Sequence, residues 1–154
     1  MADEITYKIT LWTEHISGAG TDATMYGQLI GENGKSAEVV FDNAGNDFEY
    51  GTWGTYSITT TDIGEPTQLR LFHDNGGYRP GWCLGLGHVQ HYAPVEGSRY
   101  PKLTQWNLVI DTTVEADDLT DAFGERTKTV PGVWLASDSG GIDKTFNLKR
   151  SSKR

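Results

Sequence analysis

Cysteine is nearly absent from this chain of 154 residues, in which Cys83 is the only one. A single thiol cannot form an internal disulfide, so a disulfide-stapled fold is excluded and stability must come from packing, with or without a bound metal. Cys83 lies in the apolar run Trp82-Cys83-Leu84. That context predicts a small buried side chain rather than a reactive thiol.

Long apolar runs are missing as well. No stretch of the sequence approaches the roughly 20 residues that a membrane-spanning helix needs. The first residues, Met1-Ala2-Asp3-Glu4, are acidic where a secretory signal would be basic and then apolar. We therefore expect the chain as given to be water-soluble, with peripheral membrane association left open and the compartment unassigned.

Positively charged residues are few: the chain has 13 Lys and Arg residues and 21 Asp and Glu residues, which give a net charge of −8. Nucleic acids and anionic membranes are polyanions that would repel such a chain. We expect no nucleic-acid partner, and an anionic surface would have to be approached with the help of a cation. The length and the 36 % hydrophobic fraction fit one packed globular domain, expected to be monomeric in isolation.

Helical patterning is scarce, with residues 115–123 as the one modest helical candidate. Alternation with a period of two, rich in β-branched and aromatic residues, recurs instead in short runs. These runs are 5–13, 24–30, 37–41, 52–60, 68–73, 81–92, 105–114 and, more weakly, 144–149, whereas 127–141 is expected to be a loop. Gly, Asp and Asn dominate the turns between them. The pattern predicts an all-β, antiparallel sandwich.

Several motifs follow one another in the order found in one family of β-sandwich domains. They are Ser17-Gly18-Ala19-Gly20-Thr21-Asp22-Ala23, then Asn46-Asp47-Phe48-Glu49 followed by Gly51, then His73-Asp74-Asn75-Gly76-Gly77 and Gly81-Trp82. In this order the chain resembles the PLAT family, also called LH2, of polycystin-1, lipoxygenase and alpha-toxin domains. The resemblance implies a sandwich of two four-stranded sheets. We assign the domain to residues 5–113, with residues 114–154 as a C-terminal extension that packs on the sandwich or completes it.

The glycine- and aspartate-rich connections supply ligands suited to calcium, because Ca²⁺ prefers six to eight oxygen ligands and tolerates irregular geometry. Gly18 and Gly20 can present main-chain carbonyls while Asp22 offers a carboxylate. Asp74 and Asn75 add side-chain oxygens from another connection. The family resemblance implies a site that joins these two connections at one end of the sandwich.

A second candidate site lies in the motif Asn46, Asp47 and Glu49, where three oxygen-bearing side chains fall within four residues. Such density costs repulsion unless a cation or hydrogen-bond donors compensate it. In related lipoxygenase domains this motif also contributes calcium ligands. The alternative, for both candidate sites, is that these residues cap turns through hydrogen bonds to the backbone.

Aromatic residues near these connections are candidates for contact with a membrane or a partner, because interfacial Trp and Tyr favour the headgroup layer. We choose Tyr78 first, then Trp53 and Trp106. Trp12 and Trp82 lie inside apolar strand runs and are expected in the core. The sequence thus predicts a calcium-binding module that docks reversibly on membrane lipids. The alternative is a protein-docking module in which calcium only stiffens the loops.

An enzymatic function has its best support in His88-Val89-Gln90-His91. The two histidines are three positions apart, however, and would point to opposite faces of a strand. The sequence has no Gly-x-Ser-x-Gly, His-Glu-x-x-His or phosphate-binding glycine motif. We therefore expect no catalysis.

Overall fold

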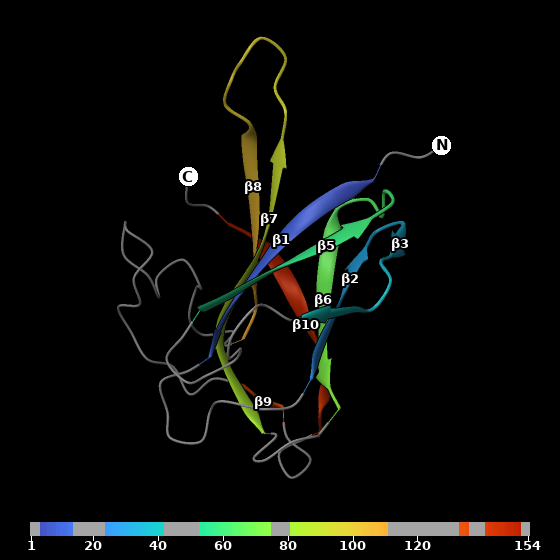
Figure 1. Ribbon diagram of the computed structural model, residues 1–154, viewed down its shortest axis with the longest axis vertical. Helices are drawn as coiled ribbons and strands as arrows, with labels where there is room; N and C mark the ends of the chain where they lie inside the picture. Colours follow the sequence, from blue (N-terminus) through green and yellow to red (C-terminus); the bar gives the residue numbers. More distant parts are fainter. Residues whose placement is uncertain are drawn as a thin grey trace.

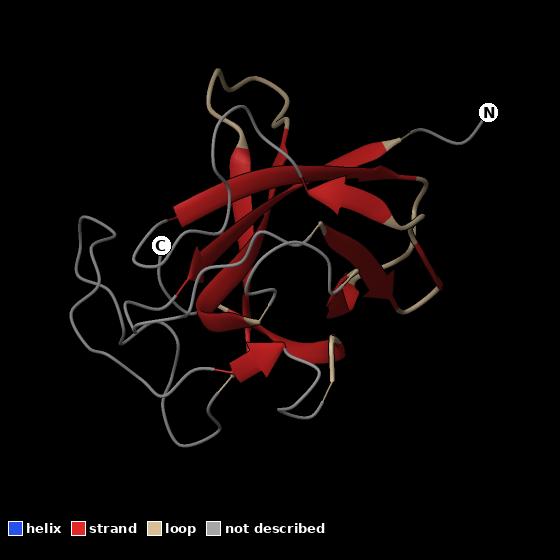
Figure 2. Cartoon of the chain, turned by 60° about the horizontal axis from the view of Figure 1, so that its bottom comes forward, coloured by secondary structure: helices blue, strands red, loops and turns tan. Residues whose placement is uncertain are grey.

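The computed structural model describes residues 4–13, 24–41, 53–74, 81–110, 133–135 and 141–151. Their secondary structure consists of ten strands and no helix, so this part of the chain contains no helix that could cross a bilayer (Figure 2). The strands are β1 (Ile5–Thr13), β2 (Met25–Gly31), β3 (Gly34–Lys35), β4 (Val39–Phe41), β5 (Trp53–Thr60), β6 (Pro66–His73), β7 (Trp82–Ala93), β8 (Lys102–Leu108), β9 (Val133–Leu135) and β10 (Asp143–Arg150).

Every strand pairing is antiparallel, and the strands follow the order β3-β2-β6-β10-β8-β7-β1-β5, with β4 on β2 and β9 on β7. We call the part from β8 to β5 the β1 leaf and the part from β3 to β6 the β2 leaf. Strand β10 pairs with both leaves. The predicted all-β antiparallel fold is confirmed. The division into two four-stranded sheets is confirmed only in part, because β10 connects the leaves into one continuous sheet (Figure 1).

The core lies between the two leaves and follows from strand alternation. In β1 the side chains of Tyr7, Ile9 and Leu11 are buried, while their neighbours on the other face are exposed or half-buried. The leaves meet where the rings of Phe41 and Tyr56 stack, with centroids 4.8 Å apart and planes 9° apart. Gly27 makes room for this stack, because a Cβ there would lie 2.1 Å from the Phe41 ring.

Most of the expected strand runs are present, with three differences. Strand β8 begins earlier than the expected run 105–114 and ends at Leu108. The short strands β3 and β9 were not expected, and β9 lies within the predicted loop 127–141. The helical candidate 115–123 falls outside the described residues.

Strand β10 is the main structural contribution of the predicted C-terminal extension. It pairs with β6 through five residues and with β8 through three. Arg70 on β6 reinforces the first pairing: its guanidinium donates to both carboxylate oxygens of Asp143 and also to Glu38. The hydrogen bond to Asp143 is the largest of the interactions that raise the pKa of Arg70. The domain boundary at residue 113 lies outside the described residues and stays a prediction.

The sandwich has two distinct ends, set by the direction of its strands. Residues 94–101 join β7 to β8 at the end that points to the top of Figure 1, and we call this the hairpin end. At the opposite end, which we call the loop end, five connections start and finish. They comprise residues 14–23, 42–52, 75–80, 111–132 and 136–140.

Candidate functional site

The predicted calcium ligands fall on the connections of the loop end, and most lie outside the described residues. This applies to Gly18, Gly20, Asp22, Asn46, Asp47, Glu49 and Asn75, and to the predicted contact residue Tyr78. Asp74 is the one predicted ligand that the structure describes. No three His, Cys, Asp or Glu side chains come together within the described ranges. The calcium site therefore stays a prediction.

Asp74 joins the ends of two connections. Its Oδ1 accepts a hydrogen bond from the backbone N–H of Thr24 at 3.1 Å, and its own N–H donates to the carbonyl of Thr24 at 3.2 Å. Thr24 follows residues 14–23 directly, and Asp74 directly precedes residues 75–80. The two connections predicted to share the first calcium site are thus held together at this point. A carboxylate has about four lone-pair sites, so a carboxylate that accepts from the backbone can also be a metal ligand.

Buried hydrogen bonds fix the strand ends beneath these connections. The indole Nε1 of Trp82 donates to Oγ1 of Thr13, the last residue of β1, at 2.7 Å. Nε2 of His73, the last residue of β6, donates to the carbonyl of Leu135 at 2.7 Å. Leu135 also pairs with Trp82, so the ends of β1 and β6 are connected through β7 and β9. The loop end therefore has a rigid base.

Replacing Thr13 by Val tests this base, since the new side chain has the same shape but no hydroxyl. We expect a loss of about 1–3 kcal/mol in the free energy of unfolding, because the buried indole N–H loses its acceptor. Thr6→Val is the matched control on the same strand, where the hydroxyl bonds Thr59 on the exposed face. Urea denaturation should show a change below about 0.5 kcal/mol for this control. Equal losses of unfolding free energy in the two variants would contradict a stabilising role for the hydrogen bond between Thr13 and Trp82.

Trp53, one of the predicted contact residues, is exposed, and its contact with a membrane or partner stays a prediction. It is the first residue of β5, pairs across the strands with Trp12, and has 36 % of its surface exposed. The two indole rings are 5.0 Å apart at 52°. Residues 42–52 directly precede Trp53, and residues 14–23 begin two positions after Trp12, so the pair lies at the loop end with Trp53 exposed. Trp82 is buried as expected, whereas Trp12 is half-buried on the outer face of the β1 leaf.

Trp106 lies in the core, and its predicted surface contact is wrong. The side chain is 6 % exposed, its Nε1 donates to Glu65 at 3.3 Å, and its ring meets Tyr7 edge-on at 6.3 Å. Burial, with a smaller contribution from Asp62, raises the pKa of Tyr7 in the same region. The signal that would have placed Trp106 correctly is its spacing of two from the buried Leu108.

The histidines support the expectation from strand geometry. The ring of His88 lies 6.3 Å from that of Trp53 on the outer face, while His91 lies 5.4 Å from Tyr7 on the core side. They point to opposite faces of β7, so they do not form one site.

Charge is distributed unevenly between the ends. The described residues contain eight Asp or Glu and eight Lys or Arg residues. The five connections of the loop end contain twelve acidic and three basic residues, a net charge of −9. The net negative charge of the chain therefore belongs to the connections of the loop end, and the three that carry or adjoin predicted calcium ligands, residues 14–23, 42–52 and 75–80, contribute −4 of it.

The hairpin end has a feature that the sequence reading missed. Among the described residues six large hydrophobic side chains are exposed, and four of them belong to the β7–β8 hairpin. These four are Tyr92, Val95, Tyr100 and Leu103. One predicted strand ended at Tyr92 and the next began at residue 105, so the sequence predicted only an ordinary connection between them.

Comparison with known proteins agrees with the motifs and the fold, since residues 7–101 match the PLAT/LH2 domain. The chain belongs to this family. Mouse lipoxygenase homology domain-containing protein 1 is 41 % identical over 86 residues, 51 % of this chain and 4 % of that protein. The mouse polycystin family receptor for egg jelly is 33 % identical over 91 residues, 58 % of this chain and 4 % of that protein. The PLAT/LH2 chain thus spans a small part of the relatives it matches.

Solved structures share the architecture of this PLAT/LH2 chain. A crystal structure of coral 8R-lipoxygenase superposes with a TM-score of 0.61 at 19 % identity, over 93 % of this chain and 17 % of that one. Alpha toxin from Clostridium absonum gives 0.55 at 20 % identity, over 96 % of this chain and 32 % of that one. At these identities the likeness shows the fold alone. A PLAT/LH2 domain with such neighbours is consistent with a module that docks on a membrane or a protein.

Proposed function

We propose that this chain is a non-catalytic, calcium-binding PLAT module that docks reversibly on anionic lipid surfaces through its loop end. The observation that carries the proposal is the pair of backbone and side-chain hydrogen bonds between Thr24 and Asp74. These bonds join the end of the connection that contains Asp22 to Asp74, where the next connection begins, and these two carboxylates belong to the first candidate site. The second candidate site, Asn46 to Glu49, lies in another connection of the same end.

The mechanism is a local reversal of charge. Without a cation, the connections of the loop end repel anionic headgroups because of their net charge of −9. Bound Ca²⁺ would neutralise the carboxylates and bridge to lipid phosphates. Trp53, already exposed beside these connections, would then enter the headgroup layer together with Tyr78. The buried hydrogen bonds of Thr13 and His73 hold the described strand ends from which these connections start.

Related structures give independent support. The structure of coral 8R-lipoxygenase is described as one of calcium activation via a C2-like domain. A calcium-dependent 11R-lipoxygenase, with a TM-score of 0.51, is described in terms of calcium regulation. Both proteins are far larger than this chain, which covers 17 % of each.

Co-sedimentation with vesicles tests the proposal. With vesicles of equal parts phosphatidylcholine and phosphatidylserine, we expect the protein in the pellet with calcium, and Trp53→Ala should weaken this binding by about tenfold. When a chelator removes the calcium, the protein that calcium had bound to the vesicles should be found in the supernatant. A module that docks on a protein, with calcium only stiffening its loops, would show no difference between the two conditions, and that result would overturn the proposal.

A further inference from the structure

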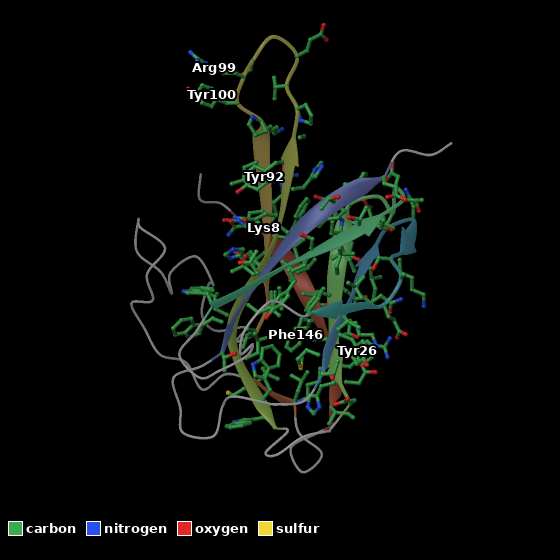
Figure 3. All side chains as sticks on the ribbon, viewed as in Figure 1. Lys8, Tyr26, Tyr92, Arg99, Tyr100 and Phe146 are labelled. Carbon is green, nitrogen blue, oxygen red and sulfur yellow. The ribbon has the colours of Figure 1, made fainter. Side chains whose placement is uncertain are left out.

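The β7–β8 hairpin extends beyond the other strands of the sandwich (Figure 1). Residues 92–103 include no buried residue, and Tyr100 has 70 % of its surface exposed. Figure 3 shows the side chains of Arg99 and Tyr100 near the tip, with Tyr92 closer to the body of the sandwich. Four of the six exposed large hydrophobic side chains described in the structure are concentrated here. Exposed apolar clusters of this kind mark interaction sites.

The tip is a defined turn rather than a loose connection. Gly97 has a φ of +80°, and the N–H of Ser98 donates to the carbonyl of Val95 at 3.1 Å. Oγ of Ser98 accepts from the N–H of Tyr100 at 3.1 Å. These bonds fix the backbone that presents Arg99 and Tyr100 to solvent, so little conformational entropy would be lost on contact.

Charge at the hairpin has the opposite sign to that of the loop end. Arg99 and Lys102 outnumber Glu96, whereas the connections of the loop end have a net charge of −9. Glu96 lies in the same turn as Arg99, so residues 92–103 have a net charge of +1. Electrostatic interactions are screened over about 8 Å at physiological ionic strength, so a surface that touches the tip experiences mainly these local charges.

We propose that the β7–β8 hairpin is a second docking element, which contacts anionic phospholipid without calcium. Arg99 and Lys102 bind headgroup phosphates, while Val95, Tyr100 and Leu103 enter the interface. A lipid surface fits the hairpin better than a protein does, because the hairpin has only twelve residues, 92–103, and a stable protein interface takes about 20–30 residues on each side. A bilayer needs no complementary pocket.

This contact does not depend on the proposed calcium site, whose predicted ligands belong to the other end of the sandwich. Binding in chelator measures the hairpin alone, and the increase on adding calcium measures the loop end. The two proposals can therefore fail separately.

The first experiment measures binding to the same mixed vesicles in chelator over a titration of lipid. We expect weak binding that increases with the phosphatidylserine fraction. Arg99→Gln with Lys102→Gln should weaken it by about tenfold to thirtyfold, and Val95→Ser with Tyr100→Ser by about tenfold. Lys8→Gln with Lys35→Gln removes the same charge from two exposed lysines outside the hairpin and should have little effect. Equal weakening by this control, or no binding of the wild type, would overturn the proposal.

The second experiment identifies the surface that touches lipid. Cys83 is fully buried, so a cysteine introduced at the surface can be labelled selectively. A polarity-sensitive dye on Glu96→Cys should shift to the blue with vesicles in chelator, whereas the same dye on Thr61→Cys, in another turn, should not. A shift at both positions or at neither would refute docking through the hairpin. Unchanged melting temperatures of the variants exclude misfolding as the cause.

Discussion

A chain truncated after residue 113 is expected not to fold, although the match to the PLAT/LH2 family ends at residue 101. The truncation removes β9 and β10, and β10 is the strand that connects the two leaves. Both β6 and β8 would be left with an unpaired edge, where backbone N–H and C=O groups lose their partners. Phe146 would also be lost from the core.

The size of this effect follows from what β10 contacts. Its buried Phe146 alone contributes about 3–5 kcal/mol, the usual cost of truncating a buried Phe to Ala. The ion pairs of Asp143 with Arg70 add to this, although both side chains are partly exposed and the contribution is about 1 kcal/mol or less. Domains of this size have total stabilities of only about 5–15 kcal/mol. Loss of the entire strand β10 therefore removes most of the free energy that stabilises the folded state.

Circular dichroism and thermal unfolding check this expectation. The truncated chain should show no cooperative transition, while Phe146→Ala in the full chain should lower the free energy of unfolding by about 3–5 kcal/mol. Thr145→Ala is the control on the same strand, because its side chain is exposed and should change stability by less than about 0.5 kcal/mol. Cooperative unfolding of the truncated chain at the temperature of the full chain would show that residues 5–113 form a complete domain.

The sequence was most informative where local patterns determine structure. The alternation in β1 and β5 identified both strands and their buried faces, since each strand has one face on the core. The spacing of His88 and His91 correctly placed the two rings on opposite faces. The ordered glycine and aspartate motifs identified the family, because they mark turns between strands of the right length.

Features that depend on distant contacts could not be read in the same way. Strand β10 alternates weakly, and nothing local indicates that it lies between β6 and β8, which are more than 30 residues away. Trp106 was mistaken for a surface residue because its polar neighbours suggested exposure, whereas the pairing of β8 with β7 places it opposite the buried Val89. The hairpin end was missed because exposure depends on how far β7 and β8 extend past the other strands.

Neutralising Asp74 should separate the structural and the metal-binding roles of this carboxylate. Asp74→Asn keeps an oxygen that can accept the hydrogen bond from the N–H of Thr24, but it removes the negative charge. We expect stability without calcium to change by less than about 0.5 kcal/mol. Calcium affinity should fall by about tenfold or more, because ligand charge is a main determinant of Ca²⁺ binding.

Asp62→Asn is the matched control, because its Oδ1 accepts the N–H of Gly64 at 2.8 Å in the turn between β5 and β6. That turn lies at the hairpin end, so the same loss of charge should leave calcium affinity unchanged. Calorimetric titration gives the affinities directly, and the rise in melting temperature with calcium gives a second measurement. Asp22→Asn should behave like Asp74→Asn if the two connections joined at Thr24 form one site. Equal affinities for wild type and both variants would reduce Asp74 to a turn cap and would contradict a calcium site formed by Asp22 and Asp74. Docking in chelator through the hairpin would remain, because its cations and exposed aromatic rings do not involve the loop end.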